Sequence, residues 1–201
     1  MREPSLRILI FDEDIVRASV LEEGLKEPGC GDVEVLVVTA PTGLAARIAE
    51  FDPDVIFMDL QNPNRDSFEN MLAVSKAVAR PIAVFVDEAD AGTIDQAVEA
   101  GVSAYIVDGL KKERVKSILD VTISRFNAVT KLRRELEETR AELADRKTID
   151  QAKRLLMKRR KLTEEQAYAL MRKTAMSKSC RIVEVAQSMI VVADLLGEEN
   201  P

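Results

Sequence analysis

Over the first 124 residues, short and almost continuously apolar segments alternate with segments of helical periodicity. Such apolar runs are typical of strands buried on both faces of a sheet, and the periodic segments between them have the length of crossover helices. The predicted strands are Leu6–Phe11, Val33–Val38, Val55–Met58, Ile82–Val86 and Ala104–Val107. The predicted helices are Ile15–Lys26, Thr42–Phe51, Ser67–Val78 and Ala91–Ala100. The pattern predicts an α/β domain over residues 1–124 with a doubly wound, five-stranded parallel sheet.

After the fifth predicted strand, the pattern is that of helix alone. No glycine or proline occurs from Lys111 to about Lys147, and residues recur at the alternating three- and four-residue steps of a coiled-coil seam. The seam positions are Val115, Ile118, Thr122, Arg125, Val129, Leu132, Leu136, Thr139 and Leu143, of which the two threonines and the arginine weaken it. We expect a homodimer through this coiled coil, with a linker helix over residues 125–145. The alternative is a single helix packed on its own chain.

Three further helical stretches over residues 146–201 predict a small all-α, three-helix module. The first has its apolar stripe at Ile149, Ala152, Leu155 and Leu156. The second opens with the capping box Thr163-Glu164-Glu165-Gln166. The third ends at Gly197, with an inward face formed by Ile182, Val185, Ala186, Met189, Ile190, Ala193 and Leu196.

The net charge of −6 is distributed unevenly along the chain. Residues 1–124 hold 12 basic and 23 acidic side chains, whereas residues 146–181 hold 12 basic and 3 acidic ones. So basic a block suggests a polyanionic partner. The alternative is a solvated face whose charges pair with the acidic N-terminal half.

Several protein classes are excluded by what the sequence lacks. No apolar run approaches the ~20 residues of a membrane span, and the N-terminus does not resemble a signal peptide. Cys30 and Cys180 lie far apart, which argues against a disulfide framework and fits a reducing cytosol. The absence of histidine excludes histidine metal ligands, general bases and phosphoacceptors. We therefore expect a cytoplasmic protein that does not contact a membrane.

Carboxylates follow two of the predicted strands. Asp12 and Glu13 come after the first strand and Asp59 ends the third, so all three are expected at the carboxyl edge of the sheet. Clustered carboxylates repel one another unless a cation or a proton relieves them, and Mg²⁺ suits such oxygen ligands. Asp59 is then a candidate nucleophile toward a phosphoryl group. The alternative is that these acidic residues serve solubility.

Several segments resemble the receiver domain of two-component response regulators. They are Arg7-Ile8-Leu9-Ile10-Phe11-Asp12-Glu13-Asp14, Pro53-Asp54-Val55-Ile56-Phe57-Met58-Asp59-Leu60, Asn62-Pro63-Asn64-Arg65-Asp66 and Gly101-Val102-Ser103-Ala104-Tyr105-Ile106-Val107. The resemblance implies a CheY-like fold, Asp59 as phosphoacceptor, and Asp12, Glu13 and Asp59 as Mg²⁺ ligands. It also implies the backbone carbonyl of Gln61 as a further ligand.

Two departures from the receiver pattern bear on regulation. The family normally ends its fourth strand with a Ser or Thr that binds the phosphoryl group, where this chain has Val86 and Asp87. The family's lysine after the fifth strand is replaced by Asp108, followed by Gly109. Removing a cation and adding carboxylates disfavours an aspartyl-phosphate. We therefore predict that phosphorylation is not the operative switch.

The C-terminal module is similar to the ANTAR domain, a three-helix RNA-binding output module of transcription antiterminators. The similarity lies in Arg146-Lys147-Thr148-Ile149-Asp150-Gln151-Ala152-Lys153-Arg154-Leu155-Leu156-Met157, Leu162–Tyr168, Leu170–Met176 and Ile182–Ala186. Arg154 and Lys161 stand where that family usually has glycine. The order of receiver, coil and ANTAR module resembles the antiterminators of nitrate and nitrite assimilation. This resemblance implies leader-mRNA stem-loops as ligands and a nitrate-sensing regulatory partner protein.

The candidate RNA contacts are basic residues, because cations engage phosphates and hairpin loops present unstacked bases. They are Arg146, Lys147, Lys153, Arg159, Arg172, Lys173, Lys178 and Arg181. Tyr168 is the module's one aromatic residue and is expected to be partly buried. Two alternatives remain: a DNA-binding response regulator with a helix-turn-helix output, and an adaptor that binds protein only. An enzyme is the least favoured function, because only self-phosphorylation offers chemistry.

Overall fold

The computed structural model describes residues 5–60, 65–108 and 111–195. The chain divides into two compact units, Met1–Thr130 and Lys131–Pro201. No helix in the described ranges is both long and apolar enough to cross a bilayer.

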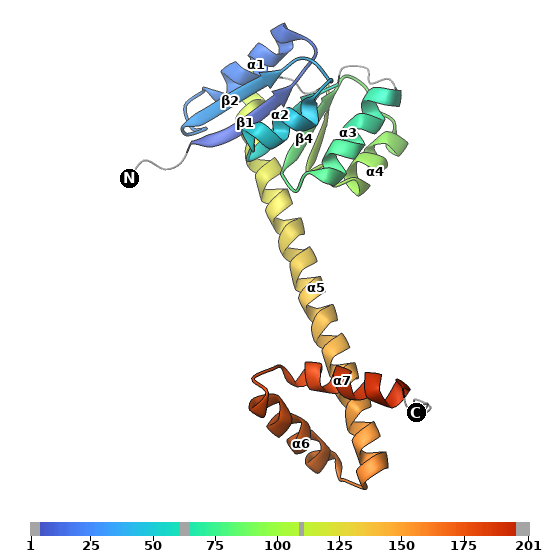
Figure 1. The fold of residues 1–201 in the computed structure, drawn as a ribbon. Helices are drawn as coiled ribbons and strands as arrows, with labels where there is room; N and C mark the ends of the chain where they lie inside the picture. The colour runs from blue at the N-terminus through green and yellow to red at the C-terminus, as the bar shows by residue number, and fades with distance from the viewer. Residues whose placement is uncertain (1–4, 61–64, 109–110, 196–201) are drawn as a thin grey trace. The chain divides into compact units, whose positions relative to one another are not determined.

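The first unit is built on a five-stranded parallel sheet (Figure 1). Its strands are β1 (Leu6–Phe11), β2 (Val33–Val38), β3 (Val55–Asp59), β4 (Ile82–Val86) and β5 (Ala104–Val107), in the order β2-β1-β3-β4-β5. The order reverses at β1, as in other doubly wound sheets. The predicted fold class is thereby confirmed, and the predicted strand bounds differ from the observed ones by a single residue.

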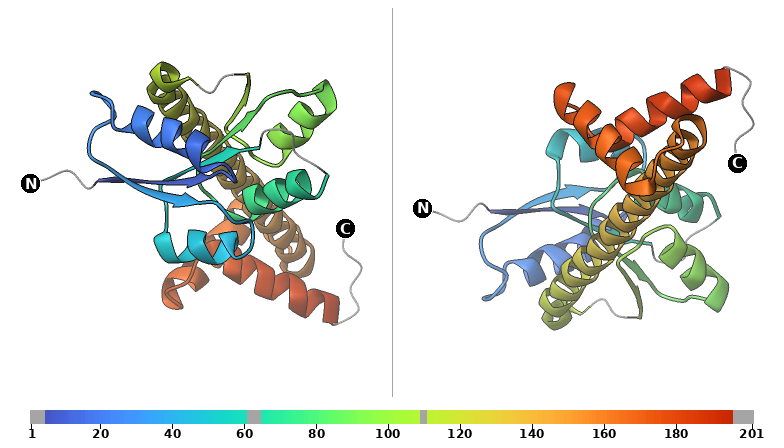
Figure 2. Two further views of the ribbon diagram at one scale, coloured as in Figure 1. Left: turned by 90° about the horizontal axis from the view of Figure 1, so that it is seen from above. Right: turned by 90° about the horizontal axis from the view of Figure 1, so that it is seen from below.

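Helices cover both faces of this sheet (Figures 1 and 2). One face carries α1 (Ile15–Leu25) and the first turns of α5 (Val115–Arg160), and the other carries α2 (Leu44–Phe51), α3 (Arg65–Ala77) and α4 (Ala91–Glu99). Alternate strand residues point to opposite faces. Ile8 and Ile10 therefore pack beneath α1, whereas Leu9 and Phe11 pack beneath α2 and α3.

Helix α5 is longer than the sequence pattern predicts. It runs without a break for 46 residues, so the stretch around Ile149 is its continuation and not a separate helix. No glycine or proline interrupts α5, and residues with high helix propensity dominate it. The helix ends at Arg160, where Lys161 takes a left-handed backbone conformation with φ of 54°.

The first part of the predicted seam packs inside the first unit. Val115 and Ile118 are buried in its core, and Thr122 is buried with its hydroxyl donating to the carbonyl of Ile118 at 2.6 Å. These three positions are therefore unavailable to a coiled coil, and predicting a seam from Val115 onward was wrong at its start. The apolar seam residues that stay exposed are Val129, Leu132, Leu136 and Leu143.

The second unit combines the end of α5 with α6 (Glu164–Ser177) and α7 (Ile182–Leu195). Its core holds Ala152, Leu156, Ala167, Met171 and Ala186. The predicted capping box is present: the Thr163 hydroxyl accepts from the backbone N–H of Gln166, and the Gln166 side chain accepts from that of Thr163. The predicted helix end at Leu196 and Gly197 lies outside the described residues.

Candidate functional site

Three carboxylates follow neighbouring strands at the carboxyl edge of the sheet. Asp12 comes directly after β1, Asp59 ends β3 and Asp87 comes directly after β4. Asp12 is 2% exposed and the Asp59 side chain is fully buried, whereas Asp87 is exposed. The predicted meeting of Asp12 and Asp59 at this edge thus follows from the pairing of β1 with β3.

Arg17 on α1 binds the Asp59 carboxylate. Its Nε donates to Oδ2 and its Nη2 to Oδ1, each at 3.0 Å. The remaining terminal nitrogen, Nη1, lies 3.3 Å from Oδ1 of Asp87. The Arg17 side chain is 24% exposed, so much of this ion pair is shielded from solvent.

Burial alters the protonation of both inner carboxyls. It raises the pKa of Asp59, against the hydrogen bonds and charge of Arg17, which lower it. Burial also raises the pKa of Asp12 to about 6, with a smaller contribution in the same direction from the charge of Asp59. Oδ1 of Asp12 accepts from the backbone N–H of Asp14 at 2.8 Å. Its Oδ2 is buried without a hydrogen-bond partner among the described residues.

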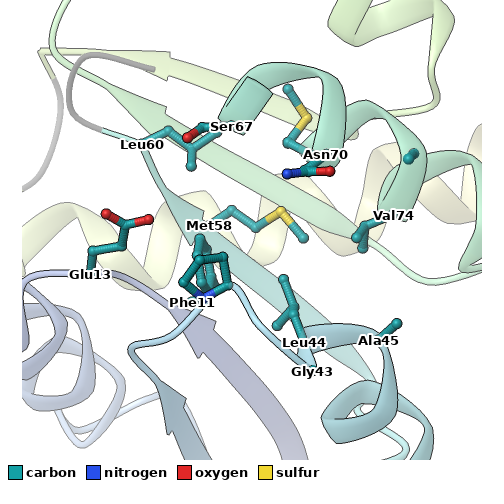
Figure 3. Close-up of a pocket in the computed structure, with 13 residues that line it drawn as sticks. Phe11, Glu13, Gly43, Leu44, Ala45, Met58, Leu60, Ser67, Asn70 and Val74 are labelled. Atoms are coloured by element: carbon teal, nitrogen blue, oxygen red, sulfur yellow. The ribbon is translucent and has the colours of Figure 1, made fainter. Parts of the chain in front are cut away.

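Glu13 lies apart from this ion pair. It is exposed and lines a cavity of about 360 Å³ between β1, β3, α2 and α3. In Figure 3, Glu13 stands at one end of this cavity near Leu60 and Ser67, while Ala45 and Val74 stand at the other end. The lining is mostly apolar.

The observed arrangement does not fit a divalent cation, although its carboxylates are the ligands that Mg²⁺ prefers. Both oxygens of Asp59 accept from Arg17, and the described ranges contain no three acidic or cysteine side chains placed so that they could hold a metal ion together. The unpartnered oxygen of Asp12 is a position that a cation or a proton would satisfy. Gln61 lies outside the described residues. The metal roles of Asp12, Glu13 and Asp59, and the phosphoacceptor role of Asp59, stay predictions.

The departures from the receiver pattern are visible in the structure. Val86 is buried at the end of β4. Asp87 follows it, and Arg17 forms hydrogen bonds with both Asp87 and Asp59. Asp108 follows β5 with φ of 46° and is exposed. Gly109 lies outside the described residues.

In the second unit, two of the predicted RNA contacts are held by carboxylates of their own unit. The Lys153 ammonium lies 2.7 Å from Asp150 Oδ1 and 2.6 Å from Glu164 Oε1, and its side chain is only 15% exposed. These hydrogen bonds, that with Asp150 first, raise the pKa of Lys153. Arg181 pairs with Glu184 at 3.4 Å and with Asp145 at 3.7 Å.

Four other predicted RNA contacts are free of such pairing. Lys147, Arg172, Lys173 and Lys178 are exposed and form no ion pair within the described part of the chain. Arg146 is exposed, and its charge helps to lower the pKa of Asp150.

A groove of about 510 Å³ runs between the end of α5, α6 and α7. Its lining includes the basic residues Arg159, Arg160 and Lys178 and the apolar residues Leu170 and Met171. Tyr168 is exposed, at 44%, and is therefore less buried than expected.

Arg17 is the one residue of the acidic site that the sequence analysis missed. Its spacing from Asp59, 42 residues along the chain, carries no motif. The signal was electrostatic: three carboxylates at one edge, without the usual lysine, require a cation from elsewhere. Arg17 is the basic residue of α1, whose N-terminus lies at this edge.

Comparisons with known proteins bear on both units. Residues 137–190 match the family model of the ANTAR domain. The transcriptional regulatory protein PdtaR of Mycobacterium tuberculosis is 27% identical over 192 residues, covering 95% of this chain and 91% of that protein. The nitrate regulatory protein of Klebsiella oxytoca is 34% identical over 80 residues, 40% of this chain and 20% of that protein.

Among solved structures, a CheY-like response regulator receiver domain of Methanospirillum hungatei superimposes with a TM-score of 0.53 at 17% identity. The superimposed region covers 62% of this chain and 98% of the receiver domain. This similarity shows the fold of the first unit.

Proposed function

We propose that this response regulator, which joins a receiver-type fold to an ANTAR domain and is not an enzyme, is a transcription antiterminator that binds stem-loops of leader mRNA. The observation that carries the proposal is the group of exposed cations on the ANTAR unit. Lys147, Arg172, Lys173 and Lys178 have no acidic partner in the described part of the chain, so they are available to phosphates.

Hairpin RNA suits this surface better than extended single strands. The module has a single aromatic residue, Tyr168, and no row of aromatic side chains on which successive bases would stack. Hairpin loops instead present a few unstacked bases flanked by phosphates. Binding a stem-loop in this way would prevent a terminator from forming in the transcript, and it would take place in the cytoplasm.

Control is proposed to come from a partner protein and not from phosphorylation. The receiver-type unit lacks the hydroxyl and the ammonium that normally contact the phosphoryl group, since Val86, Asp87 and Asp108 replace them. A switch requires contacts that differ between two states, and a covering partner supplies such contacts. A nitrate-sensing partner is favoured by the sequence resemblance and by the similarity to a nitrate regulatory protein. The active form is proposed to be a homodimer through the exposed seam of α5.

Gel-shift titration of a leader hairpin tests RNA binding. The variant Arg172→Ala/Lys173→Ala/Lys178→Ala should bind at least about tenfold more weakly and show a salt slope smaller by about 2. Its charge-matched control is Lys26→Ala/Arg47→Ala/Lys76→Ala, which removes three exposed cations from the first unit. The control should bind like the wild type. Equal affinity of both triple variants would place the RNA surface elsewhere.

The same assay separates the alternatives. Duplex DNA of the hairpin sequence should bind weakly and without sequence preference, because the A-form groove, the loop bases and the 2′-hydroxyls are missing. Preference for the duplex would favour a DNA-binding regulator. Loss of all nucleic-acid binding, with the fold intact, would favour a protein adaptor.

The regulatory part is tested in cells with Asp59→Asn. Antitermination should remain inducible in this variant, because the proposed switch does not use an aspartyl-phosphate. A variant that is locked off, while the wild type responds and carries a phosphoryl group, would overturn this part of the proposal and leave RNA binding untouched.

A further inference from the structure

The carboxyl edge of the sheet holds an excess of negative charge. Asp12, Asp59 and Asp87 come from three adjacent strands, and Asp108 follows the next one. Two of the four are buried, where like charges repel strongly unless a cation lies between them. Within the described residues, Arg17 is the cation that forms an ion pair with this group.

Arg17 binds both oxygens of Asp59. A guanidinium presents its N–H groups in a planar fork that matches the two oxygens of a carboxylate. Here Nε and Nη2 each donate at 3.0 Å to a different oxygen of Asp59, and Nη1 reaches Asp87 at 3.3 Å. Arginine stays charged at all physiological pH values, so the cation of this pair is always present.

The same contact occupies the space that a metal ion would need. Mg²⁺ binds carboxylate oxygens at about 2.0–2.1 Å in near-octahedral geometry, and each oxygen of Asp59 already accepts an N–H group of Arg17 at 3.0 Å. A phosphoryl donor would meet the same obstacle, because Arg17 lies beside both oxygens of Asp59 and its hydrogen bonds lower their nucleophilicity. Arg17 would have to move aside to admit either a metal ion or a phosphoryl donor.

We propose that Arg17 is a resident counter-ion of Asp59 that takes the place of a divalent cation and keeps the site closed to metal and phosphoryl donors. The proposal explains why Asp87 and Asp108 are tolerated at this edge: the positive charge comes from α1 and not from the loop after β5. It goes beyond the proposed function and does not depend on RNA binding.

Arg17→Gln is the decisive variant, because it removes the charge and the fork. With both oxygens of Asp59 free and Oδ2 of Asp12 already unpartnered, the variant should gain Mg²⁺ binding. Its melting temperature should rise with Mg²⁺ between about 0.1 and 10 mM, as expected when a ligand binds only the folded state. The melting temperature of the wild type should not respond over this range.

Two further variants test whether the gained Mg²⁺ binding is specific to loss of Arg17 and uses Asp59. Arg80→Gln removes the same charge from an ion pair with Asp52 elsewhere in the unit, at 2.7 Å, and should behave like the wild type. Arg17→Gln/Asp59→Asn should lose the Mg²⁺ response, because one ligand is gone. A response that persists in this double variant would mean that the gained metal lies elsewhere, and would contradict the proposal.

A measurement on the wild type keeps the test independent of how well the variants fold. The Arg17 Nε–Hε resonance in ¹⁵N NMR should be protected from solvent exchange and should keep its position when Mg²⁺ and then beryllofluoride are added. Displacement of this resonance, or Mg²⁺ affinity in the wild type equal to that of Arg17→Gln, would overturn the proposal. Failure of Arg17→Gln to bind Mg²⁺ while folded would overturn it too.

Discussion

Lys153 and Glu164 are joined across the turn between α5 and α6, with 2.6 Å between Nζ and Oε1. The same ammonium lies 2.7 Å from Asp150, one turn back on α5. A cation held in this way ties two helices of the second unit together, and only 15% of its side chain is exposed. These contacts give Lys153 a structural role in this unit.

Lys153→Ala should therefore lower the stability of the chain. We expect a loss of about 0.5–1 kcal/mol, small because both carboxylates remain largely hydrated after the change. Urea unfolding followed by circular dichroism measures it. Lys173→Ala, at an unpaired cation of α6, should leave the stability unchanged and weaken RNA binding. The reverse pattern would show that Lys153 reaches the RNA.

Asp12 predicts a pH dependence of stability. Its folded pKa is raised to about 6 from 3.8, so between these values the folded protein holds a proton that the unfolded chain has released. Stability therefore falls as the pH rises through this window, by about 3 kcal/mol in all. Asp12→Asn stays neutral and should gain up to about 3 kcal/mol near pH 7.5, with the gain vanishing near pH 4.

Urea unfolding of wild type and Asp12→Asn at several pH values checks this expectation. Asp95→Asn, at an exposed position of α4, is the matched control and should show no such pH-dependent gain. A gain of Asp12→Asn that stays constant from pH 4 to 8 would mean that ionisation of Asp12 is not its source.

The exposed part of the α5 seam predicts dimerisation. Leu132→Asp/Leu136→Asp places two charges where a partner helix would pack, and should yield monomers in analytical ultracentrifugation. Asn127→Asp/Ala141→Asp adds the same charge on the opposite side of the helix and should stay dimeric. An unchanged mass in the leucine variant would remove the coiled coil as the dimer interface.

Lys161 predicts a stabilising substitution. Its φ of 54° is a left-handed conformation that costs a residue with a side chain about 1 kcal/mol, whereas glycine adopts it freely. Lys161→Gly should therefore raise the free energy of unfolding by up to about 1 kcal/mol. Lys158→Gly, within the last turn of α5, should lower it by a similar amount. If both variants changed the free energy of unfolding in the same direction, the left-handed backbone of Lys161 would not be the source of the effect.

The strands and the first four helices were readable from the sequence because burial on both faces leaves a simple pattern. β3 and β4 consist of buried residues throughout, and their apolar runs mark them directly. The continuity of α5 was harder to predict, because the apolar stripe that begins at Ile149 suggested a new helix, although no glycine or proline separates it from the preceding helical stretch. The seam was predicted to start at Val115 because apolar residues recur there at steps of three and four residues. The same spacing occurs in a helix that packs on a sheet.

The residues of the candidate sites also differ in how well the sequence alone predicts them. Asp12 and Asp59 were predictable, because strand ends fix their place in any doubly wound sheet. Arg17 was not, since an arginine in the first turn of a helix can point in many directions and only the folded carboxylates select one. The pairing of Lys153 was partly readable, because Asp150 stands three residues before it on the same helix. Its contact with Glu164 depended on the turn that follows α5.

Helix α5 has one further consequence for the chain. Every residue from 127 to 144 is exposed, so in a single chain this stretch is stabilised by little more than its own backbone hydrogen bonds. In proteins most of the stability of a helix comes from the packing of an apolar face, which a single chain does not supply here. Association along Leu132 and Leu136 would supply the missing partner, so that helix formation and pairing of two chains become one equilibrium. Amide hydrogen exchange in this stretch would then slow as the protein concentration rises, while exchange in the sheet stayed the same.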